Sequence, residues 1–408
     1  MRVLLNATTL TIGGALQLGT SLIREAMSDP QGIDWRFALS RGVYDQVQRF
    51  YPDRIPHAQV FDESPAQSRR ARRRLLAFES SERPDCVFTP YGPAYVQFAA
   101  RHLLGAANPW VAHADLYSYR IMKFPREQIQ TFLLTIYRGY WFRRSEMLVV
   151  ETEFVRQGYA RRIGMPLNRI AVVPNSCAQH YWDNQGERPF PAPGARIRLL
   201  CFAAPHKHKR VDILPAVARE LVARRPQLDF EFVTTVVETD EVFQAVAQKA
   251  KALGVDGKIN NLGPVSVSAG PDLYRSCDVC FLPTVLECSS ATFAEAMAMG
   301  VPIITSDLGF LRDVCHDAAL YFAPHNAAAA AEQILKLVDD AALWQRLVAA
   351  GKRILNTLPT SSQKYLAYVR LLKDLYRGGR TDPAEQGGPH TPKQWDIDTA
   401  SDSLADRT

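Results

Sequence analysis

Glu287 and Glu295 are two carboxylates, eight positions apart, that flank a short loop of small residues. The loop, Ser289 to Thr292, lies where a predicted strand gives way to a predicted helix, and it supplies small side chains and free backbone N–H groups. Such groups at a helix N-terminus form a natural binding site for an anion, because the helix dipole reinforces the N–H donors. The same residues also fit a capped helix with a solvated glutamate in its first turn, and the local pattern favours neither interpretation.

Lys209 and Arg210 form a second candidate group, after the predicted strand Ile197–Ala203 and before a predicted helix. The ammonium group offers a point charge and the guanidinium a planar fork of donors, and both would lie beside a helix N-terminus. A diphosphate is an anion that suits this combination. His206 and Lys207 add to the basic density, and a solvated basic loop is the alternative interpretation.

Two features of the first half of the chain are also candidates. His113 ends the predicted strand Trp110–His113, where it would reach the carboxyl edge of a sheet and orient a hydroxyl or a transferring group. Gly13 and Gly14 occupy the first predicted strand-to-helix turn and would let a phosphate or a sugar approach the backbone closely. A structural histidine and a plain tight turn are the alternatives. There is no G-x-G-x-x-G, so a dinucleotide fingerprint is not supported.

The cysteines and the remaining motifs point away from metal chemistry. Cys277 and Cys280 form a lone C-x-x-C that runs into an apolar strand, and we interpret them as buried thiols. The odd total of seven cysteines indicates no disulfide framework and is typical of reducing cytosol. The sequence contains no H-E-x-x-H, no D-x-D at a strand end, no G-x-S-x-G and no P-loop, so we predict no metal site.

These residues need a scaffold that gathers strand ends at one edge, and the hydrophobic pattern predicts one. Short β-rich runs alternate with longer helical stretches, which is typical of a mainly parallel sheet covered by helices. Around the two glutamates, Val279–Leu282, Phe293–Met299 and Val301–Thr305 indicate the strand, helix and strand of one βαβ unit. Further predicted strands are Arg2–Asn6, Trp35–Leu39, Cys86–Thr89, Met147–Glu151, Ile170–Val173, Phe230–Thr235 and Ile259–Leu262; predicted helices are Leu16–Ser28, Ser68–Glu79, Ile129–Phe142, Val211–Arg224, Asp240–Leu253, Ala327–Asp339, Leu343–Ile354 and Gln363–Tyr376.

The alternation predicts two doubly wound α/β domains in tandem with a cleft between them. Three prolines and two glycines cluster within residues 183–195, which is linker composition. We therefore predict a first domain over residues 1–182 and a second over residues 196–360. Residues 379–408 are rich in Gly, Pro, Asp, Ser and Thr, and we predict a disordered tail there.

The bulk properties are those of an ordinary globular chain. Of its 408 residues, 47% are apolar and 22% are charged, and 48 basic against 42 acidic residues give a net charge of +6. This charge fits a phosphorylated substrate, an anionic membrane or nucleic acid and decides among none of them. We interpret the apolar start, Met1–Leu16, as a buried first strand rather than a signal peptide, and no run approaches the roughly 18 apolar residues of a transmembrane helix.

Two basic segments indicate a surface that could rest on anionic lipid headgroups. Ser68–Leu76 carries five arginines on a predicted helix. Farther along, Arg138, Arg143 and Arg144 are interleaved with Tyr137, Tyr140, Trp141 and Phe142. Solvated faces are the alternative; a nucleic-acid surface is the weakest one, because the segments lack a recognised nucleic-acid-binding fold.

Taken together, these residues resemble the family-4 retaining glycosyltransferases of the GT-B fold, in which two doubly wound Rossmann-like domains face each other across a cleft. The most specific match is an E-x7-E pattern formed by Glu287 and Glu295, followed by Ala296-Met297-Ala298 and Gly300-Val301-Pro302. The surrounding residues are similar to the branch that builds bacterial surface polysaccharide and lipopolysaccharide. They include Ser290-Ala291-Thr292-Phe293, Thr305-Ser306-Asp307, Gly263-Pro264-Val265, Tyr274 and Val172-Val173-Pro174-Asn175-Ser176.

The resemblance implies a role for each candidate residue. Lys209 would contact the donor diphosphate, Glu295 the ribose hydroxyls and Glu287 the donor sugar. Ser289, Ser290 and Thr292 would line the donor loop, and His113 would lie near the transferring sugar. The family often has an Arg about five residues before the lysine; Ala204 stands there in this chain, and Arg210 is the candidate substitute. The resemblance also implies that a C-terminal helix over residues 361–378 packs back on the first domain.

The sequence therefore predicts a retaining, metal-independent glycosyltransferase, with a nucleotide-diphosphate sugar as co-substrate and no other cofactor. The donor would bind the second domain, and a saccharide or lipid-linked saccharide acceptor the first, beside Gly13 and Gly14. We expect a cytoplasmic protein, peripheral on the inner face of a membrane, that binds no nucleic acid. A nucleotide-sugar epimerase of the same architecture and a non-catalytic, glycosyltransferase-like subunit are the alternatives.

Overall fold

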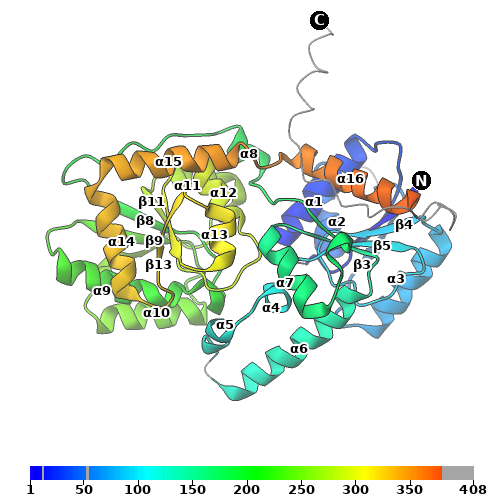
Figure 1. Cartoon of the computed structure of the whole chain (residues 1–408), viewed down its shortest axis with the longest axis horizontal. Coiled ribbons are helices and arrows are strands. Elements are labelled where there is room, and N and C mark those ends of the chain that lie inside the picture. The colour runs from blue at the N-terminus through cyan, green and yellow to red at the C-terminus, as the bar shows by residue number, and fades with distance from the viewer. Residues whose placement is uncertain (12, 52–54, 123, 379–408) are drawn as a thin grey trace, which may run out of the picture. The chain divides into compact units, whose positions relative to one another are not determined.

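The computed structural model describes residues 1–11, 13–51, 55–122 and 124–378 (Figure 1). The chain divides into two compact units, neither of which is continuous in sequence. The first unit comprises residues 1–113, 131–174 and the segment from Ser361 onward, and the second comprises residues 114–130 and 175–360. The tail predicted over residues 379–408 lies outside the described residues.

The first unit is built on a parallel sheet. Within its described residues, seven strands run in the order β3-β2-β1-β4-β5-β6-β7, so the strand order reverses between β1 and β4. Their bounds are β1 Arg2–Ala7, β2 Asp34–Ser40, β3 Ala58–Phe61, β4 Cys86–Thr89, β5 Arg101–Gly105, β6 Met147–Val150 and β7 Ile170–Val172. The main helices are α1 Gly13–Ser28, α2 Arg41–Gln48, α3 Arg69–Glu82, α4 Pro109–Ala112, α7 Glu153–Ile163 and α16 Ser361–Arg377; α6, Pro125–Arg143, begins in the second unit and continues into the first.

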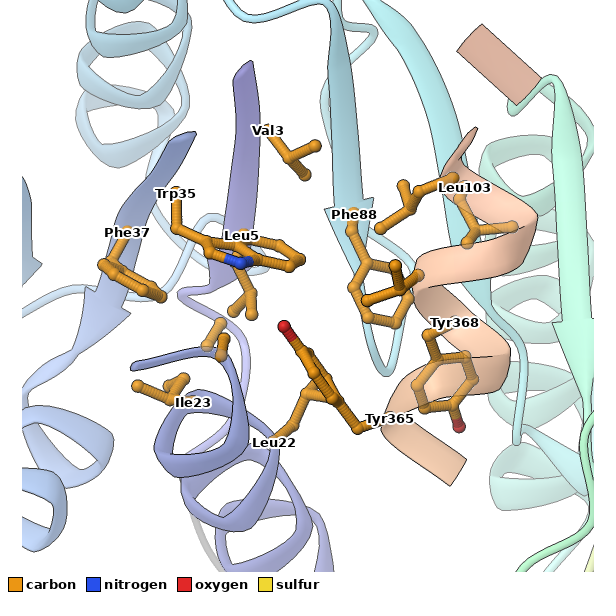
Figure 2. Close-up of a cluster of buried hydrophobic side chains, with 14 of the residues drawn as sticks. Val3, Leu5, Leu22, Ile23, Trp35, Phe37, Phe88, Leu103, Tyr365 and Tyr368 are labelled. Atoms are coloured by element: carbon orange, nitrogen blue, oxygen red, sulfur yellow. The ribbon is translucent and has the colours of Figure 1, made fainter. Parts of the chain in front are cut away.

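Helix α16 belongs to the first unit although it ends the described chain. Figure 2 shows Tyr365 and Tyr368 pointing from α16 into the apolar cluster that covers β1, β2 and β4. The ring of Tyr365 lies 6.3 Å from that of Trp35, and the ring of Tyr368 lies 5.0 Å from that of Phe88. The apolar face of α16 is therefore part of the first unit's core. Burial of this face stabilises the packing of α16 on the first unit, although the helix follows the second unit in the sequence.

The second unit repeats the architecture. Over the residues that the structure describes there, six parallel strands run in the order β10-β9-β8-β11-β12-β13. Their bounds are β8 Ile197–Cys201, β9 Phe230–Thr234, β10 Ile259–Asn261, β11 Val279–Leu282, β12 Ile303–Ser306 and β13 Ala319–Phe322. The helices are α5 Leu116–Arg120, α8 Gln179–Trp182, α9 Leu214–Arg224, α10 Glu241–Ala252, α11 Gly270–Arg275, α12 Ala291–Ala298, α13 Gly309–Cys315, α14 Ala327–Asp339 and α15 Ala341–Leu355. The predicted βαβ unit is present as β11, α12 and β12.

Residues 183–195 were predicted to be a linker, but they pack on the second unit. Arg188 forms an ion pair with the buried Asp278, and its carbonyl oxygen accepts a hydrogen bond of 3.0 Å from Trp344 Nε1. The Gly186 N–H donates to the Ala298 carbonyl at 3.0 Å. The prolines and glycines of this segment thus mark irregular backbone that is nonetheless held by side-chain contacts. The second unit also begins earlier than the predicted boundary, at Asn175, and it includes residues 114–130.

The predicted strand Trp110–His113 is wrong: Pro109–Ala112 forms the short helix α4. The Asn108 side chain accepts a hydrogen bond of 3.2 Å from the Val111 N–H, and Pro109 stands at the first turn. Asparagine at the N-cap followed by proline is a helix start, and this signal outweighs the β-branched Val111. The strand of the sheet that was predicted at Trp110–His113 is instead β5, Arg101–Gly105. This strand was not predicted because its first residues are polar.

Candidate functional site

The second unit gathers the predicted binding residues at one point of its sheet edge. Strands β8 and β11 are neighbours, and from them the chain continues to β9 on one side and to β12 on the other. This is a topological switch point, where open parallel sheets bind ligands beyond the carboxyl ends of the strands. Lys209 lies on the segment after β8, and Glu287 and Ser290 lie on the segment after β11. Residues that are far apart in sequence therefore meet at this edge.

Lys209 and Glu287 form a close ion pair at this edge. The distance from Lys209 Nζ to Glu287 Oε2 is 2.6 Å, and the side chains are only 13% and 9% exposed. The Ser290 hydroxyl lies 3.5 Å from the same ammonium group. Burial alone would raise the pKa of Glu287, but the charge and hydrogen bond of Lys209 outweigh it and hold that pKa below its ordinary value. Glu287 is therefore a carboxylate at neutral pH.

Backbone contacts fix the loop that carries Lys209. The His208 carbonyl oxygen accepts hydrogen bonds from the Val285 N–H at 2.8 Å and from the Thr284 hydroxyl at 3.2 Å. Burial lowers the pKa of His208 to about 4, so its ring is neutral at pH 7 and does not repel Lys209. Arg210 ends the 3-10 turn of residues 207–209 in a left-handed conformation, with φ of 55°. The two loops at the switch point are thus joined to each other as well as to their strands.

The guanidinium of Arg210 is directed at Asp212 rather than at the ion pair. Its Nε and Nη2 atoms donate to the two Asp212 carboxylate oxygens at 2.8 and 2.9 Å. In this two-point contact, Asp212 binds the guanidinium N–H donors that the sequence analysis considered for binding a diphosphate. Binding of the donor by Arg210 stays a prediction, and Lys209 is the cation that the structure brings to Glu287.

Glu295 lies one turn into α12 in a different environment. The hydroxyl of Tyr274 donates to Glu295 Oε2 at 3.2 Å, and Tyr181 packs edge-on against the ring of Tyr274. Burial raises the pKa of Glu295 to about 7, although both tyrosines favour the charged form. Tyr274 also donates to the Thr292 carbonyl oxygen at 3.1 Å, which ties the start of α12 to the preceding helix.

The start of α12 differs from an ordinary capped helix. Ser290 occupies the N-cap position, but its side chain makes no capping hydrogen bond with the described helix and lies instead beside Lys209. The Thr292 hydroxyl donates to the Phe202 carbonyl at 3.4 Å, and Ser289 is partly exposed. The N–H groups of the first turn of α12 therefore lie close to the ion pair, an arrangement that suits an anion.

The remaining candidates lie in the first unit. His113 follows α4, its backbone N–H donates to the Pro109 carbonyl at 2.9 Å, and its ring meets that of Phe154 edge-on at 5.3 Å. Gly13 and Gly14 are the first two residues of α1, after β1 at the first unit's own switch point. The structure thus brings Lys209, Glu287 and Ser290 together, places Glu295 nearby on α12, and assigns His113 and the glycine pair to the other unit.

Sequence reasoning missed one member of the site. Tyr274 was noted as part of the family pattern, but Tyr181 was not, because it lies on α8 in a segment predicted to close the first domain. Its ring lies 5.9 Å from that of Tyr274. The run Ser176-Cys177-Ala178 precedes α8 and is the local signal that comes nearest to indicating this helix. It is too short to predict that a helix begins there or that the helix packs against α12.

The metal-ligating residue types are dispersed. Within the described residues, no group of three or more His, Cys, Asp or Glu side chains is arranged to hold a metal ion. All seven cysteines are buried, and burial raises the pKa of Cys277 and of Cys280, as expected for thiols in an apolar environment. No helix in the described ranges is both long and apolar enough to cross a membrane.

Solved structures share this architecture along nearly the whole chain. A sucrose-phosphate synthase from Thermosynechococcus elongatus has a TM-score of 0.69 at 15% identity, covering 93% of this chain and 100% of that one. The Anabaena protein Alr3699/HepE in complex with UDP and glucose has a TM-score of 0.65 at 13% identity, covering 92% and 100%. The chain has the GT-B fold, and the predicted α/β class with two doubly wound sheets is confirmed.

The second unit also carries a family signature. Residues 196–340 match the model of the family glycosyl transferases group 1. A D-inositol 3-phosphate glycosyltransferase from Nocardioides sp. is 29% identical over 265 residues, which are 59% of this chain and 55% of the relative. O-antigen chain mannosyltransferase B from Escherichia coli is 29% identical over 216 residues, 50% of this chain and 55% of the relative. The matches thus span little more than half the length of these curated relatives.

Proposed function

We propose that this chain is a retaining glycosyltransferase that moves a sugar from a nucleoside diphosphate to an acceptor hydroxyl. The observation that carries the proposal is the contact between Lys209, Glu287 and the start of α12 at the switch point of the second sheet. A buried cation beside the N-terminus of a helix suits a diphosphate, and this site lies inside the segment that matches the glycosyl transferase family. The HepE structure with UDP and glucose supports a nucleotide-sugar donor.

Each side chain has a task in the proposed reaction. Lys209 and the N-terminus of α12 would stabilise the charge that develops on the departing diphosphate, without a requirement for a bound metal. Glu287 would exchange its contact with Lys209 for hydroxyls of the transferring sugar. Glu295, held by Tyr274, would accept hydrogen bonds from the ribose hydroxyls. We assign no protein nucleophile, and retention would follow from attack on the same face of the sugar that the diphosphate leaves.

We further propose that the first unit binds the acceptor, with Gly13 and Gly14 allowing close approach and His113 near the transferring sugar. The similarity to an O-antigen chain mannosyltransferase supports a saccharide or lipid-linked saccharide acceptor in surface polysaccharide or lipopolysaccharide assembly. An acceptor carried on a lipid would bring the protein to the inner face of the cytoplasmic membrane as a peripheral protein.

Donor binding is the first test. The full chain is screened by thermal unfolding against a panel of nucleoside diphosphates and their sugars, because a bound ligand raises the melting temperature by mass action. We expect one nucleotide base to stabilise the wild type. Replacing Lys209 and Glu287 together by Met and Gln removes both charges without leaving one buried alone, and we expect this variant to bind at least about tenfold more weakly. Failure of every nucleoside diphosphate to bind the wild type would contradict the proposal and favour the alternative, a non-catalytic glycosyltransferase-like subunit.

Transfer is the second test. The donor identified in the screen is incubated with and without saccharide acceptors, and the anomeric configuration of the product is read by NMR spectroscopy. We expect a product with the configuration of the donor, formed only when an acceptor is present. A donor sugar that epimerises without an acceptor would replace the proposal by an epimerase, and a product of inverted configuration would contradict retention.

A further inference from the structure

Helix α6 presents a stripe of large apolar side chains to solvent. Ile129, Phe132, Leu133, Ile136 and Tyr140 are spaced at i, i+3, i+4, i+7 and i+11, which places them on one face of the helix. In most proteins a stripe of this spacing turns toward the core. Here each of the five side chains is more than half exposed. Leu134 and Tyr137 widen the exposed apolar area, which is the sort of patch that marks an interaction surface.

The rest of α6 shows why the stripe faces outward. Within α6, which the structure describes in full, the buried residues are Gly139 and Phe142. Gly139 allows a close approach, since a Cβ there would lie 3.3 Å from Ile163, and Phe142 packs edge-on against Tyr159 at 5.2 Å. The last turn thus anchors the helix to α7 through small and aromatic contacts, and the preceding turns keep their apolar face in solvent.

An aromatic chain of contacts connects this stripe to the basic helix α3. The ring of Tyr137 stacks on that of Tyr95 at 6.0 Å. The guanidinium of Arg72, on α3, lies 5.8 Å from the same Tyr95 ring. On the other side, the guanidinium of Arg144 lies 4.9 Å from the ring of Tyr140. The two basic segments singled out in the sequence are therefore parts of one surface in the first unit.

This surface is strongly basic as well as apolar. Arg69, Arg70, Arg73 and Arg74 are exposed on α3, and Arg143 and Arg144 are exposed at the end of α6. The acidic residues of α3 do not offset them: Glu79 is buried and accepts a hydrogen bond of 2.9 Å from the Ala100 N–H, and Glu82 pairs with Arg36. Residues 131–144 of α6 and its end contain no acidic residue. The positive charge thus faces solvent next to the apolar stripe.

We propose that this surface, called here the α3–α6 surface, binds an anionic phospholipid bilayer. The apolar side chains of α6 would enter the boundary between headgroups and acyl chains, and the arginines would contact lipid phosphates. A second copy of the chain is a poorer occupant, because a two-fold interface sets each patch against itself and would bring the arginine clusters together. The proposal names the surface through which the peripheral location proposed above is reached, but it does not require the transfer activity.

Sedimentation with lipid vesicles tests the α3–α6 surface without donor or acceptor. The full chain is mixed with vesicles of phosphatidylglycerol and phosphatidylcholine, or of phosphatidylcholine alone. We expect binding to the anionic vesicles and at least about a tenfold weaker partition onto the neutral ones. Replacing Arg69, Arg70 and Arg73 by Gln should lower anionic binding by about fivefold for each arginine. The matched control replaces exposed Arg49, Arg219 and Arg346 by Gln and should bind like the wild type.

The apolar stripe is tested separately. Phe132, Leu133 and Ile136 are replaced together by Ser, and we expect at least about a hundredfold loss of vesicle binding. The control replaces Leu167, Leu262 and Leu366, exposed leucines outside the surface, by Ser and should keep binding. All of these side chains are exposed, so the variants should fold. A wild type that stays in the supernatant with anionic vesicles, or stripe variants that still sediment, would overturn the proposal.

A single introduced cysteine reports the orientation. Because all seven native cysteines are buried, a Leu133→Cys variant can be labelled selectively with a polarity-sensitive fluorophore. We expect its emission to shift to the blue with anionic vesicles, and that of a labelled Leu366→Cys variant to stay unchanged. An equal shift at both positions would contradict docking through α6. A dimer of the wild type that light scattering shows to dissociate in the Ser variant would identify a second copy as the occupant instead.

Discussion

Replacing Glu295 by Gln should make the protein more stable at alkaline pH while weakening donor binding. Burial raises the pKa of Glu295 to about 7, from the 4.5 of an exposed glutamate. A raised carboxyl pKa means that the folded state holds the proton more tightly than the unfolded state. Its contribution to stability is therefore fully present below pH 4.5 and is lost as the pH rises through 7, where the carboxylate must be charged inside the protein.

The size of the effect follows from the two pKa values. Each pH unit of difference corresponds to about 1.4 kcal/mol, so the change from 4.5 to about 7 costs roughly 3 kcal/mol once the group is ionised in both states. Glutamine is neutral at every pH, and its carbonyl oxygen can still accept the hydrogen bond from Tyr274. We therefore expect the Glu295→Gln variant to match the wild type near pH 4.5 and to exceed it by up to about 3 kcal/mol at pH 8.5.

Urea unfolding of the full chain, followed by tryptophan fluorescence between pH 5 and pH 8.5, measures this difference as a function of pH. The matched control is Glu332→Gln, an exposed carboxylate on α14 in the same unit, which should give a difference near zero throughout. The same Glu295→Gln protein should bind the nucleoside diphosphate identified in the donor screen about tenfold more weakly, since a charged acceptor of the ribose hydroxyls is lost. A difference in stability that does not grow with pH, or a variant less stable than the wild type at pH 8.5, would refute the reasoning.

Two further predictions concern contacts that the structure makes explicit. Lys209→Met should destabilise the second unit by about 3–5 kcal/mol, because it leaves the Glu287 carboxylate buried without its cation, and adding Glu287→Gln should restore most of the loss in thermal unfolding. A double variant as unstable as Lys209→Met would show that the ion pair is not the cause. Gly158→Ala should lower the urea midpoint although alanine favours helices, because its Cβ would lie 2.4 Å from the Ala112 carbonyl oxygen and push α7 away from α4. Gly257→Ala, where nothing lies within 4 Å, is the control and should change the midpoint little.

Local signals were sufficient for most of the elements. The βαβ unit around the glutamates was predictable because an apolar run, a loop of small residues and Gly300 mark its strand, helix start and helix end within 25 residues. The same signals misled at Val111, where a β-branched residue in an apolar run was weighed above the Asn108-Pro109 helix start. Strand β5 was missed because Arg101 and His102 look exposed in sequence, whereas the His102 side chain is buried and bonded to Thr89 at 2.8 Å.

Which segments of the chain make up each unit could not be predicted from the local sequence pattern. Residues 114–130 belong to the second unit through contacts such as that of Glu127 with Lys207 at 3.0 Å and the stacking of Tyr117 on His325 at 6.1 Å. These pairs are about 80 and 200 residues apart, and nothing in either segment indicates the other. For the same reason Tyr181 could not be assigned to Glu295. Residues that favour turns indicate the local path of the chain. Whether a segment belongs to a given core depends on which helix and sheet faces pack together after folding.

The two glutamates show how far the properties of identical residue types can diverge over eight positions of the chain. Glu287 has a cation 2.6 Å away, and its pKa lies below the ordinary value, so it stays charged across the physiological range. Glu295 accepts a hydrogen bond from the Tyr274 hydroxyl, and burial raises its pKa to about 7, so a substantial fraction of it is protonated at neutral pH. If ionised Glu295 holds the ribose, donor affinity should rise between pH 6 and pH 8 in the wild type and stay flat in Glu295→Gln. Titration calorimetry over this range separates the two carboxylates, because Glu287 contributes no titration there.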